Sequence, residues 1–236
     1  MIYLSRSDIE KIAEPIIQKY KSLCVSEKYL CYRVDMLELC SILGYTVVYV
    51  NLTKDGSILG QTSSCQIWTT IQDDSMNDTL FLLDGKTILI DKRLLLPKLI
   101  GRKNFTIAHE LAHLILNQQL SDSTDTGNRV FCDYRRSIQP KKKITDWYEW
   151  QADALAAAIL LPLEVIQDYM FFFGLGDKMK VLSRKYSRNK YDSFCFMAES
   201  LQVSKSALAY RMEQFGLLER NLLIKEATEK RGSWQK

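Results

Sequence analysis

The only two histidines among the 236 residues lie four positions apart in the apolar segment AHELAHLIL, residues 108–116. If this segment is a helix, His109 and His113 share one face, with Cβ atoms roughly 5–6 Å apart, and both ring nitrogens can reach one ion. Neutral imidazole binds Zn²⁺ at about 2.0–2.1 Å. Glu110 projects to the side, where it can act on a water molecule as a general base. This HExxH spacing predicts a zinc centre with hydrolytic chemistry.

A catalytic zinc usually has three protein ligands and one position left for water. With no third histidine, the third ligand must be a carboxylate or a thiolate. Glu149 and Asp153 are the interior acids of the apolar segment DWYEWQADALAAAILLP, and their spacing places them on one helix face. A buried ionised carboxylate is costly unless it is paired or bound to a metal. We therefore predict Glu149 as the ligand and Asp153 as the acceptor of a ligand histidine N–H, which fixes its tautomer.

Three other residues remain alternatives for the third ligand. Asp153 could bind the ion itself. Asp146 is better explained as the N-cap of its helix. Cys132 lies in a long polar stretch and would reach the ion only if that stretch folds inward.

The expected reaction is hydrolysis of a peptide bond. Zinc lowers the pKa of water and polarises the scissile carbonyl, while Glu110 takes a proton from water and returns it to the leaving amine. The developing oxyanion needs a further donor. Tyr148, Tyr134, Arg135 and backbone N–H groups are the candidates, and the sequence does not choose among them.

The elements before the histidine segment combine helices with strands. An amphipathic helix is predicted near residues 7–20, with Ser7 and Glu10 as a capping box. A second helix is predicted to end near Gly44, followed by a strand at Thr46–Val50. A further strand is predicted in QIWTTI, and a hairpin of two apolar runs around Asp84-Gly85. Asn104 or Thr106 is the expected cap of the histidine helix, which continues to about Gln118. These patterns predict an antiparallel or mixed sheet in an α+β fold.

Residues 117–145 form a long polar stretch, the next helix ends at Pro162, and residues 163–236 are predicted to be mostly helical. Within them, LQVSKSALAYRMEQFGLL is similar to the second half of a helix-turn-helix, with Val203-Ser204 as turn and cap and Ser206–Phe215 as the second helix. Residues 177–236 hold 13 Lys and Arg against 7 Asp and Glu. Such a surplus more often marks a solvated helical surface than a nucleic-acid site, so direct nucleic-acid binding is the less favoured interpretation.

Composition is that of an ordinary globular protein, with 47% hydrophobic and 25% charged residues. The N-terminal segment lacks the long apolar core of a signal peptide, and no window reaches the length of a membrane span. The six cysteines form no CxxC pair, which argues against a thiolate zinc site. We expect a cytoplasmic protein without membrane contact.

The segments FTIAHELAHLIL and EWQADALAAAILLP together resemble the ImmA/IrrE metallopeptidases, a zincin-like group, over roughly residues 5–165. The resemblance implies Zn²⁺ on His109, His113 and Glu149, with Glu110 as base. It also implies a typical substrate, a helix-turn-helix repressor whose cleavage releases stress-response or mobile-element genes. It divides the chain into a zincin-like peptidase domain, 1–165, and a helical region, 166–236, that is helix-turn-helix-like at 199–218.

Two features depart from the family pattern. Ala112 stands where family members commonly have Gly, a small change. The stretch before Glu149 is long and basic at Arg135, Arg136 and Lys141–Lys143, so specificity could differ. The main expectation is a zinc endopeptidase acting on a protein regulator. Its alternative is a DNA- or regulator-binding protein with a structural or vestigial zinc site, and a toxin-like partner of an antitoxin repressor is a third interpretation.

Overall fold

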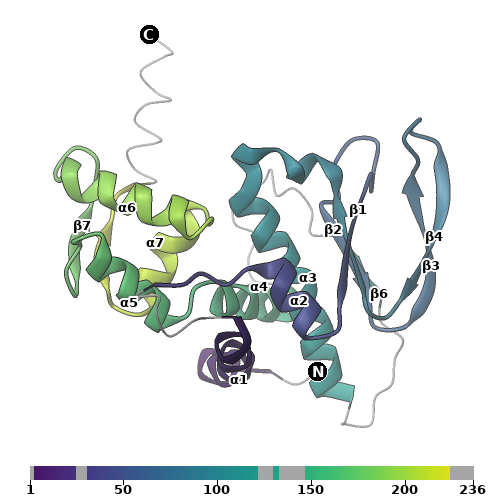
Figure 1. The fold of residues 1–236 in the computed structure, drawn as a ribbon, viewed down its shortest axis with the longest axis horizontal. Coiled ribbons are helices and arrows are strands. Elements are labelled where there is room, and N and C mark those ends of the chain that lie inside the picture. Colours follow the sequence, from purple (N-terminus) through teal and green to yellow (C-terminus); the bar gives the residue numbers. More distant parts are fainter. Residues whose placement is uncertain (1–2, 25–30, 122–129, 133–146, 224–236) are drawn as a thin grey trace. The chain divides into compact units, whose positions relative to one another are not determined.

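The structure is a computed structural model that describes residues 3–24, 31–121, 130–132 and 147–223. The chain forms two compact units. The N-terminal unit comprises residues 1–24 and 34–160, and the C-terminal unit comprises residues 25–33 and 161–236. Within each unit, helices and short strands combine as expected for an α+β fold (Figure 1). The division expected from the sequence, after residue 165, stays a prediction about independent domains.

The N-terminal unit is built around a four-stranded mixed sheet with strand order β1-β5-β2-β6. Strands β1 and β5 are parallel, whereas β2 is antiparallel to both β5 and β6. A two-stranded antiparallel sheet of β3 and β4 lies beside it (Figure 1). The strands are β1 (Thr46–Val50), β2 (Gly60–Ser63), β3 (Gln66–Gln72), β4 (Asp78–Asp84), β5 (Thr87–Asp91) and β6 (Val130–Cys132).

Four α-helices belong to this unit among the residues described: α1 (Arg6–Cys24), α2 (Met36–Ile42), α3 (Ile100–Ser121) and α4 (Trp147–Leu160). Helix α3 is the central one, and it packs against α4, α2, β2 and β5. Its residues from Ile107 to Leu116 are all buried. A helix with apolar side chains on nearly all of its faces is expected to lie inside a protein. The predicted histidine helix and its acidic partner helix therefore lie side by side.

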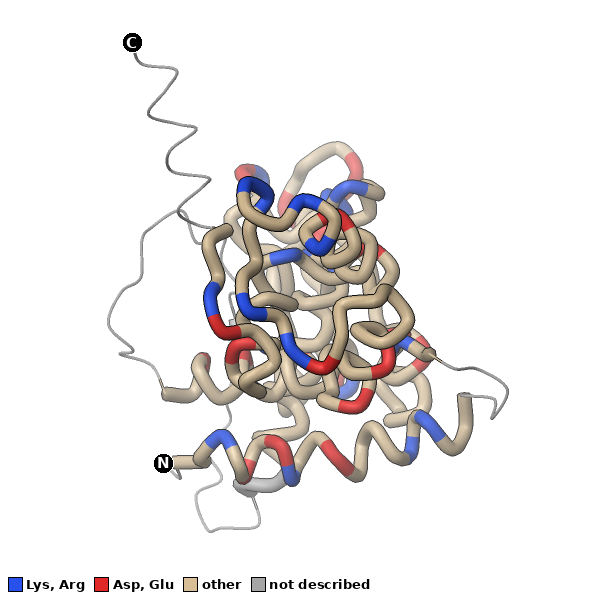
Figure 2. The backbone as a smooth tube through the Cα atoms, turned by 90° about the vertical axis from the view of Figure 1, so that its left-hand side faces the viewer, with Lys and Arg blue, Asp and Glu red and all other residues tan. Residues whose placement is uncertain are grey.

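The helix starts differ from those predicted. At α1, Ser5 and Asp8 form the capping box, in which the Asp8 N–H donates to Ser5 Oγ and the Ser5 N–H donates to Asp8 Oδ2, so the prediction of Ser7 and Glu10 was wrong. Basic and acidic residues follow one another along this helix (Figure 2). Helix α3 begins at Ile100, directly after a short 3₁₀ turn that starts at Pro97. Asn104 and Thr106 are consequently internal, so the prediction that one of them caps the helix was wrong. The Thr106 hydroxyl donates to the carbonyl of Arg102.

The hairpin predicted around Asp84-Gly85 was also wrong. The turn itself exists, since Gly85 has a left-handed backbone (φ +83°) and Asp84 accepts the N–H of Lys86. The flanking strands, however, enter different sheets, because β4 pairs with β3 and β5 pairs with β1 and β2. β1 and β2 occupy the two edges of β5, so no edge of this buried strand is left for β4.

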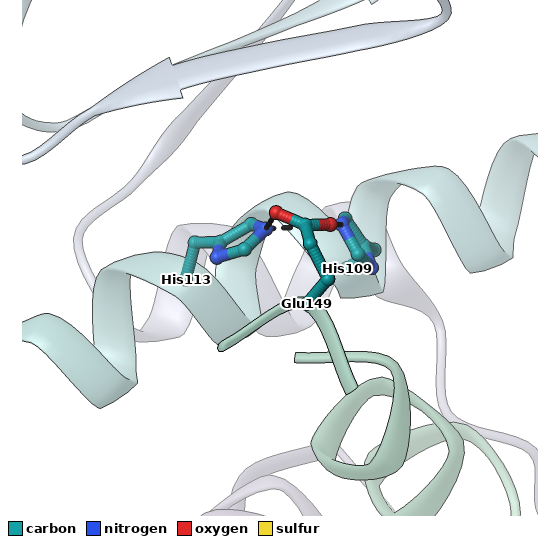
Figure 3. Close-up of side chains that lie close together, drawn as sticks. All are labelled: His109, His113 and Glu149. Atoms are coloured by element: carbon teal, nitrogen blue, oxygen red, sulfur yellow. Dashed lines mark hydrogen bonds and ion pairs between the residues drawn. The ribbon is translucent and has the colours of Figure 1, made fainter. Parts of the chain in front are cut away.

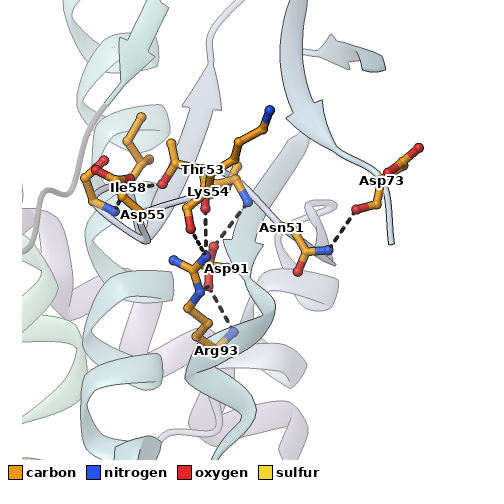
Figure 4. Close-up of polar contacts among 10 residues, drawn as sticks. Asn51, Thr53, Lys54, Asp55, Ile58, Asp73, Asp91 and Arg93 are labelled. Atoms are coloured by element: carbon orange, nitrogen blue, oxygen red, sulfur yellow. Dashed lines mark hydrogen bonds and ion pairs between the residues drawn. The ribbon is translucent and has the colours of Figure 1, made fainter. Parts of the chain in front are cut away.

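A buried polar group secures the loop between β1 and β2 (Figure 4). The fully buried Asp91 carboxylate accepts the N–H groups of Leu52 and Arg93 at 3.1 and 2.9 Å. The Arg93 guanidinium in turn donates to the carbonyls of Thr53 and Lys54 at 2.8 and 2.9 Å. A buried carboxylate must keep its hydrogen bonds, and Asp91 can keep these only in one conformation of the loop. Asp91 and Arg93 therefore fix where β2 begins.

The C-terminal unit contains α5 (Leu163–Phe172), β7 (Met179–Leu182), α6 (Arg188–Ser200), α7 (Lys205–Gln214) and β8 (Leu218–Asn221). The parallel pairing of β7 with β8 adds strands that the sequence did not predict. Ser204 caps α7 as predicted, because its hydroxyl accepts the Ala207 N–H. Residues 161–223 contain 9 Lys and Arg and 7 Asp and Glu, and the two signs are interspersed (Figure 2).

The length and apolar character of the described helices bear on whether they can cross a membrane. None of them is by itself both long and apolar enough to span a bilayer, and only α4 and α5 taken together reach that length and composition.

Candidate metal centre

The predicted ligands of the metal converge at the contact between α3 and α4 (Figure 3). His109 and His113 project from one face of α3, and Glu149 reaches them from the first turn of α4. His109 Nε2 lies 3.0 Å from His113 Nε2 and 3.2 Å from Glu149 Oε2. His113 Nε2 lies 3.4 Å from Glu149 Oε1. Among the described residues, this is the group whose ligand atoms could hold a metal ion.

The spacing of these atoms matches a tetrahedral zinc site. Bonds of about 2.0–2.1 Å at tetrahedral angles place neighbouring ligand atoms roughly 3.3 Å apart. The two Nε2 atoms lie 3.0 Å apart, and they lie 3.2 and 3.4 Å from the two different carboxylate oxygens of Glu149, all near that value. Two imidazoles and one carboxylate, all facing the same point, also form the donor set of a catalytic rather than a closed structural site. The residues present therefore fit a zinc ion.

Asp153 supports His109 from the opposite side of its ring. Its Oδ1 atom lies 2.9 Å from His109 Nδ1, one turn along α4 from Glu149. A carboxylate at Nδ1 accepts the N–H there and leaves Nε2 directed at the ligand group. Glu149 and Asp153 thus both face α3. The role of Asp153 in fixing the tautomer of His109 stays a prediction.

The charges around His109 control its protonation. Burial by itself lowers its pKa, but hydrogen bonds to Asp153 and Glu149 and the charge of Glu110 outweigh that effect and raise the pKa to about 10. For Glu149, burial by itself raises the pKa of the carboxyl group, but hydrogen bonds from both histidines outweigh that effect and lower the pKa to about 2. Burial and the neighbouring His109 charge lower the pKa of His113. The three acidic groups near His109 thus favour its protonated form in the absence of a metal ion.

Glu110 is buried on α3 against the start of β2. A Cβ atom placed on Gly60 would lie 2.7 Å from Glu110 Oε1 and 2.8 Å from its Cγ. The same Cβ would lie 2.7 Å from Thr106 Cγ2. These separations are below any normal van der Waals contact, so the side chain of Glu110 occupies space that only glycine leaves open at residue 60.

Tyr148 packs against His113 rather than standing apart from it. The two rings stack with centroids 5.0 Å apart, and the Tyr148 hydroxyl donates to the His113 carbonyl at 3.4 Å. This places Tyr148 as a support for His113. Its role as an oxyanion donor stays a prediction. Tyr134 and Arg135, the other candidates, lie outside the described residues, as do Asp146 and the side chain of Cys132 among the alternative ligands.

Two features of the site were missed from the sequence. Gly60 carries a recognisable signal, because a glycine inside a strand often marks a close approach by another group. Gln151 lies between Glu149 and Asp153 and is almost fully buried. It accepts the N–H of Leu4 at 2.8 Å. A polar residue in so apolar a helix could have been recognised by the argument used for its acidic neighbours.

A family model described as the IrrE N-terminal-like domain, of peptidase family M78, matches residues 69–213. The chain belongs to this family. The match includes both the histidine helix and α4, and it extends into the C-terminal unit. No curated protein shows significant similarity to the chain. Membership in peptidase M78 supports a metallopeptidase-type function and implies a protein substrate.

Proposed function

We propose that the chain is a zinc-dependent endopeptidase that hydrolyses a peptide bond in a protein substrate, a helix-turn-helix transcriptional repressor. The observation that carries the zinc assignment is the convergence of His109, His113 and Glu149 within 4.8 Å of one another, with a buried glutamate beside the first histidine. Membership in a peptidase family supports the hydrolytic reaction. The repressor is the substrate that the resemblance to ImmA/IrrE proteins implies.

The residues of the chain divide the work of such a reaction. A zinc ion held by His109, His113 and Glu149 would polarise the scissile carbonyl and lower the pKa of the attacking water. Glu110 takes a proton from that water at its carboxylate and later gives it to the leaving amine. Asp153 keeps the N–H of His109 on Nδ1. The burial of Glu110 keeps bulk water from competing for its proton.

Metal content and cleavage test this proposal together. Mass spectrometry of purified wild type should find about one zinc per chain, and Glu149→Ala should retain much less, because a third ligand is required. Wild type should cleave a purified helix-turn-helix repressor, with the products identified by mass spectrometry. Glu110→Gln should keep its zinc and lose turnover by at least roughly 10²-fold, since the base is removed.

The possible outcomes separate the main proposal from its alternative. A zinc-loaded wild type that cleaves none of the repressors tested, with identical behaviour in Glu110→Gln, would favour a structural site in a regulator-binding protein. Absence of zinc from reconstituted wild type would overturn the metal centre. Retained cleavage by Glu110→Gln would overturn the assignment of the base.

A further inference from the structure

The first turn of α4 is attached to the residues that precede α1. Tyr3 packs edge-on against Trp147, with ring centroids 5.1 Å apart, and stacks on Trp150 at 6.3 Å. The two tryptophans also pack against each other at 5.9 Å. Beside these rings, the Leu4 N–H donates to the buried side-chain oxygen of Gln151 at 2.8 Å. We call Tyr3, Leu4, Trp147, Trp150 and Gln151 the N-terminal clasp.

This turn of α4 is the one that carries Glu149. The first turn of any helix is its least secured part, because four N–H groups there lack a partner within the helix. Helix ends therefore fray unless side chains or packing hold them. Glu149 contributes a carboxylate from this turn, so loosening of the turn would move a ligand away from both histidines.

The clasp lies on a different side of α4 from the ligand group. At 3.6 residues per turn, Trp147 is about 200° and Trp150 about 100° around the helix from Glu149. Asp153, by contrast, shares the face of Glu149 and contacts His109. The clasp can therefore act on the metal centre only by fixing the backbone of the turn.

We propose that the N-terminal clasp positions Glu149 as a metal ligand, so that Tyr3 and Leu4 set the affinity of the site for zinc. This inference rests on the proposed metal centre. The clasp residues are positioning residues, since their ring contacts and hydrogen bond join α4 to the residues before α1. Loss of the clasp leaves His109 and His113 in place on the buried helix α3 but allows the third ligand to withdraw.

Substitution of Tyr3 gives the sharpest test, because its side chain is 60% exposed and its loss removes little buried surface. Zinc affinity is measured by competition with a chromophoric chelator, on wild type, Tyr3→Ala and Tyr3→Phe. Tyr3→Ala should bind zinc roughly tenfold more weakly, at the lower end of the effect of supporting residues around metal sites. Tyr3→Phe keeps the ring contacts and should retain wild-type affinity.

A matched control is Trp68→Ala on β3, which removes an aromatic side chain that is 62% exposed in the same unit and touches no part of the clasp. It should bind zinc as wild type does. A second clasp variant, Trp147→Ala, should weaken zinc binding as Tyr3→Ala does. Thermal unfolding with and without zinc separates positioning from general stabilisation, because a purely structural loss lowers both melting temperatures equally.

Wild-type zinc affinity in both Tyr3→Ala and Trp147→Ala would overturn the clasp while leaving the proposed function intact. An equal loss of affinity in Trp68→Ala would also overturn it, since the effect would then be unspecific. Absence of zinc binding in wild type would instead overturn the proposed metal centre, and the clasp with it.

Discussion

His109 is held at both of its ring nitrogens: Nδ1 lies 2.9 Å from Asp153 Oδ1, and Nε2 lies 3.2 Å from Glu149 Oε2. The two carboxylates come from successive turns of α4. One helix therefore supplies both the third ligand candidate and the group that orients the first ligand. A displacement of α4 would move Glu149 and Asp153 together. The contacts that hold this helix in place are therefore as important as the candidate ligands themselves.

Removal of the Asp153 carboxylate should weaken metal binding. Asp153→Ala frees the His109 ring to rotate and removes the acceptor that fixes its tautomer, so zinc affinity should fall about 10–100-fold. The matched control is Asp192→Ala on α6, since the two side chains are equally exposed at 52%. Chelator competition measures both. Equal affinities in the two variants would show that Asp153 does not support the site.

Zinc affinity should rise with pH well above neutrality. The pKa of His109 is raised to about 10 in the metal-free protein, so an incoming ion must displace a proton from it. Below that pKa, each pH unit should strengthen binding about tenfold, because one proton is released per ion bound. Chelator competition between about pH 7 and 9 measures the slope. Affinity independent of pH across this range would mean that His109 is already neutral.

The stability of the metal-free protein should change with pH in the opposite direction. His109 has a raised pKa when folded, so its contribution is complete below about 6.5 and is lost as the pH rises through about 10. Glu149 has a pKa lowered to about 2, so its contribution is present above 4.5 and is lost as the pH falls toward 2. Denaturant unfolding of metal-free protein should therefore show declining stability from pH 7 to 10.

The zinc-loaded protein provides the internal comparison for that decline. Both histidines are neutral when they bind an ion, so raising the pH should not destabilise the loaded form over the same range. A parallel decline in both forms would place the responsible group elsewhere in the chain.

The proximity of the candidate site residues was the most predictable part of the molecule. Ligand spacing on a helix is a local property, so the pairing of His109 with His113 and of Glu149 with Asp153 could be inferred from positions four apart. The expectation that both acids are buried was wrong, because the side chains of Glu149 and Asp153 are 42% and 52% exposed. The buried groups at this contact are the two histidines. Figure 3 shows the histidine pair meeting Glu149 at one point, and Asp153 contacts His109 from the same helix as Glu149.

The strand partners were not predictable in the same way. The Asp84-Gly85 turn is a local signal and is present, but which strands pair depends on burial that only the complete sheet reveals. β5 is buried along its whole length between β1 and β2, and because these two strands occupy both of its edges, it cannot also pair with β4. The N-terminal clasp is equally non-local, since it joins Leu4 to Gln151 across most of the N-terminal unit.

Gly60 should control where the proposed general base sits. A methyl group at residue 60 would meet Glu110 Oε1 and Thr106 Cγ2 at 2.7 Å each, so Gly60→Ala must displace the Glu110 side chain or the strand. The backbone of Gly60 is not left-handed, which leaves steric contact as the cause. A displacement of about 1 Å can cost roughly 10²-fold in rate, so kcat on a cleaved repressor should fall by that order.

A compensating change makes this last prediction specific. Thr106→Ser removes the methyl group that crowds residue 60 while keeping the hydroxyl that donates to Arg102. The double variant should therefore recover part of the lost kcat, whereas Thr106→Ser alone should resemble wild type. Zinc content should be unchanged throughout, since the three atoms nearest to a Cβ at residue 60 belong to Glu110 and Thr106. Loss of zinc in Gly60→Ala would show that the substitution disturbs the metal centre as a whole, and an unchanged kcat would show that Glu110 tolerates displacement because it is not the base.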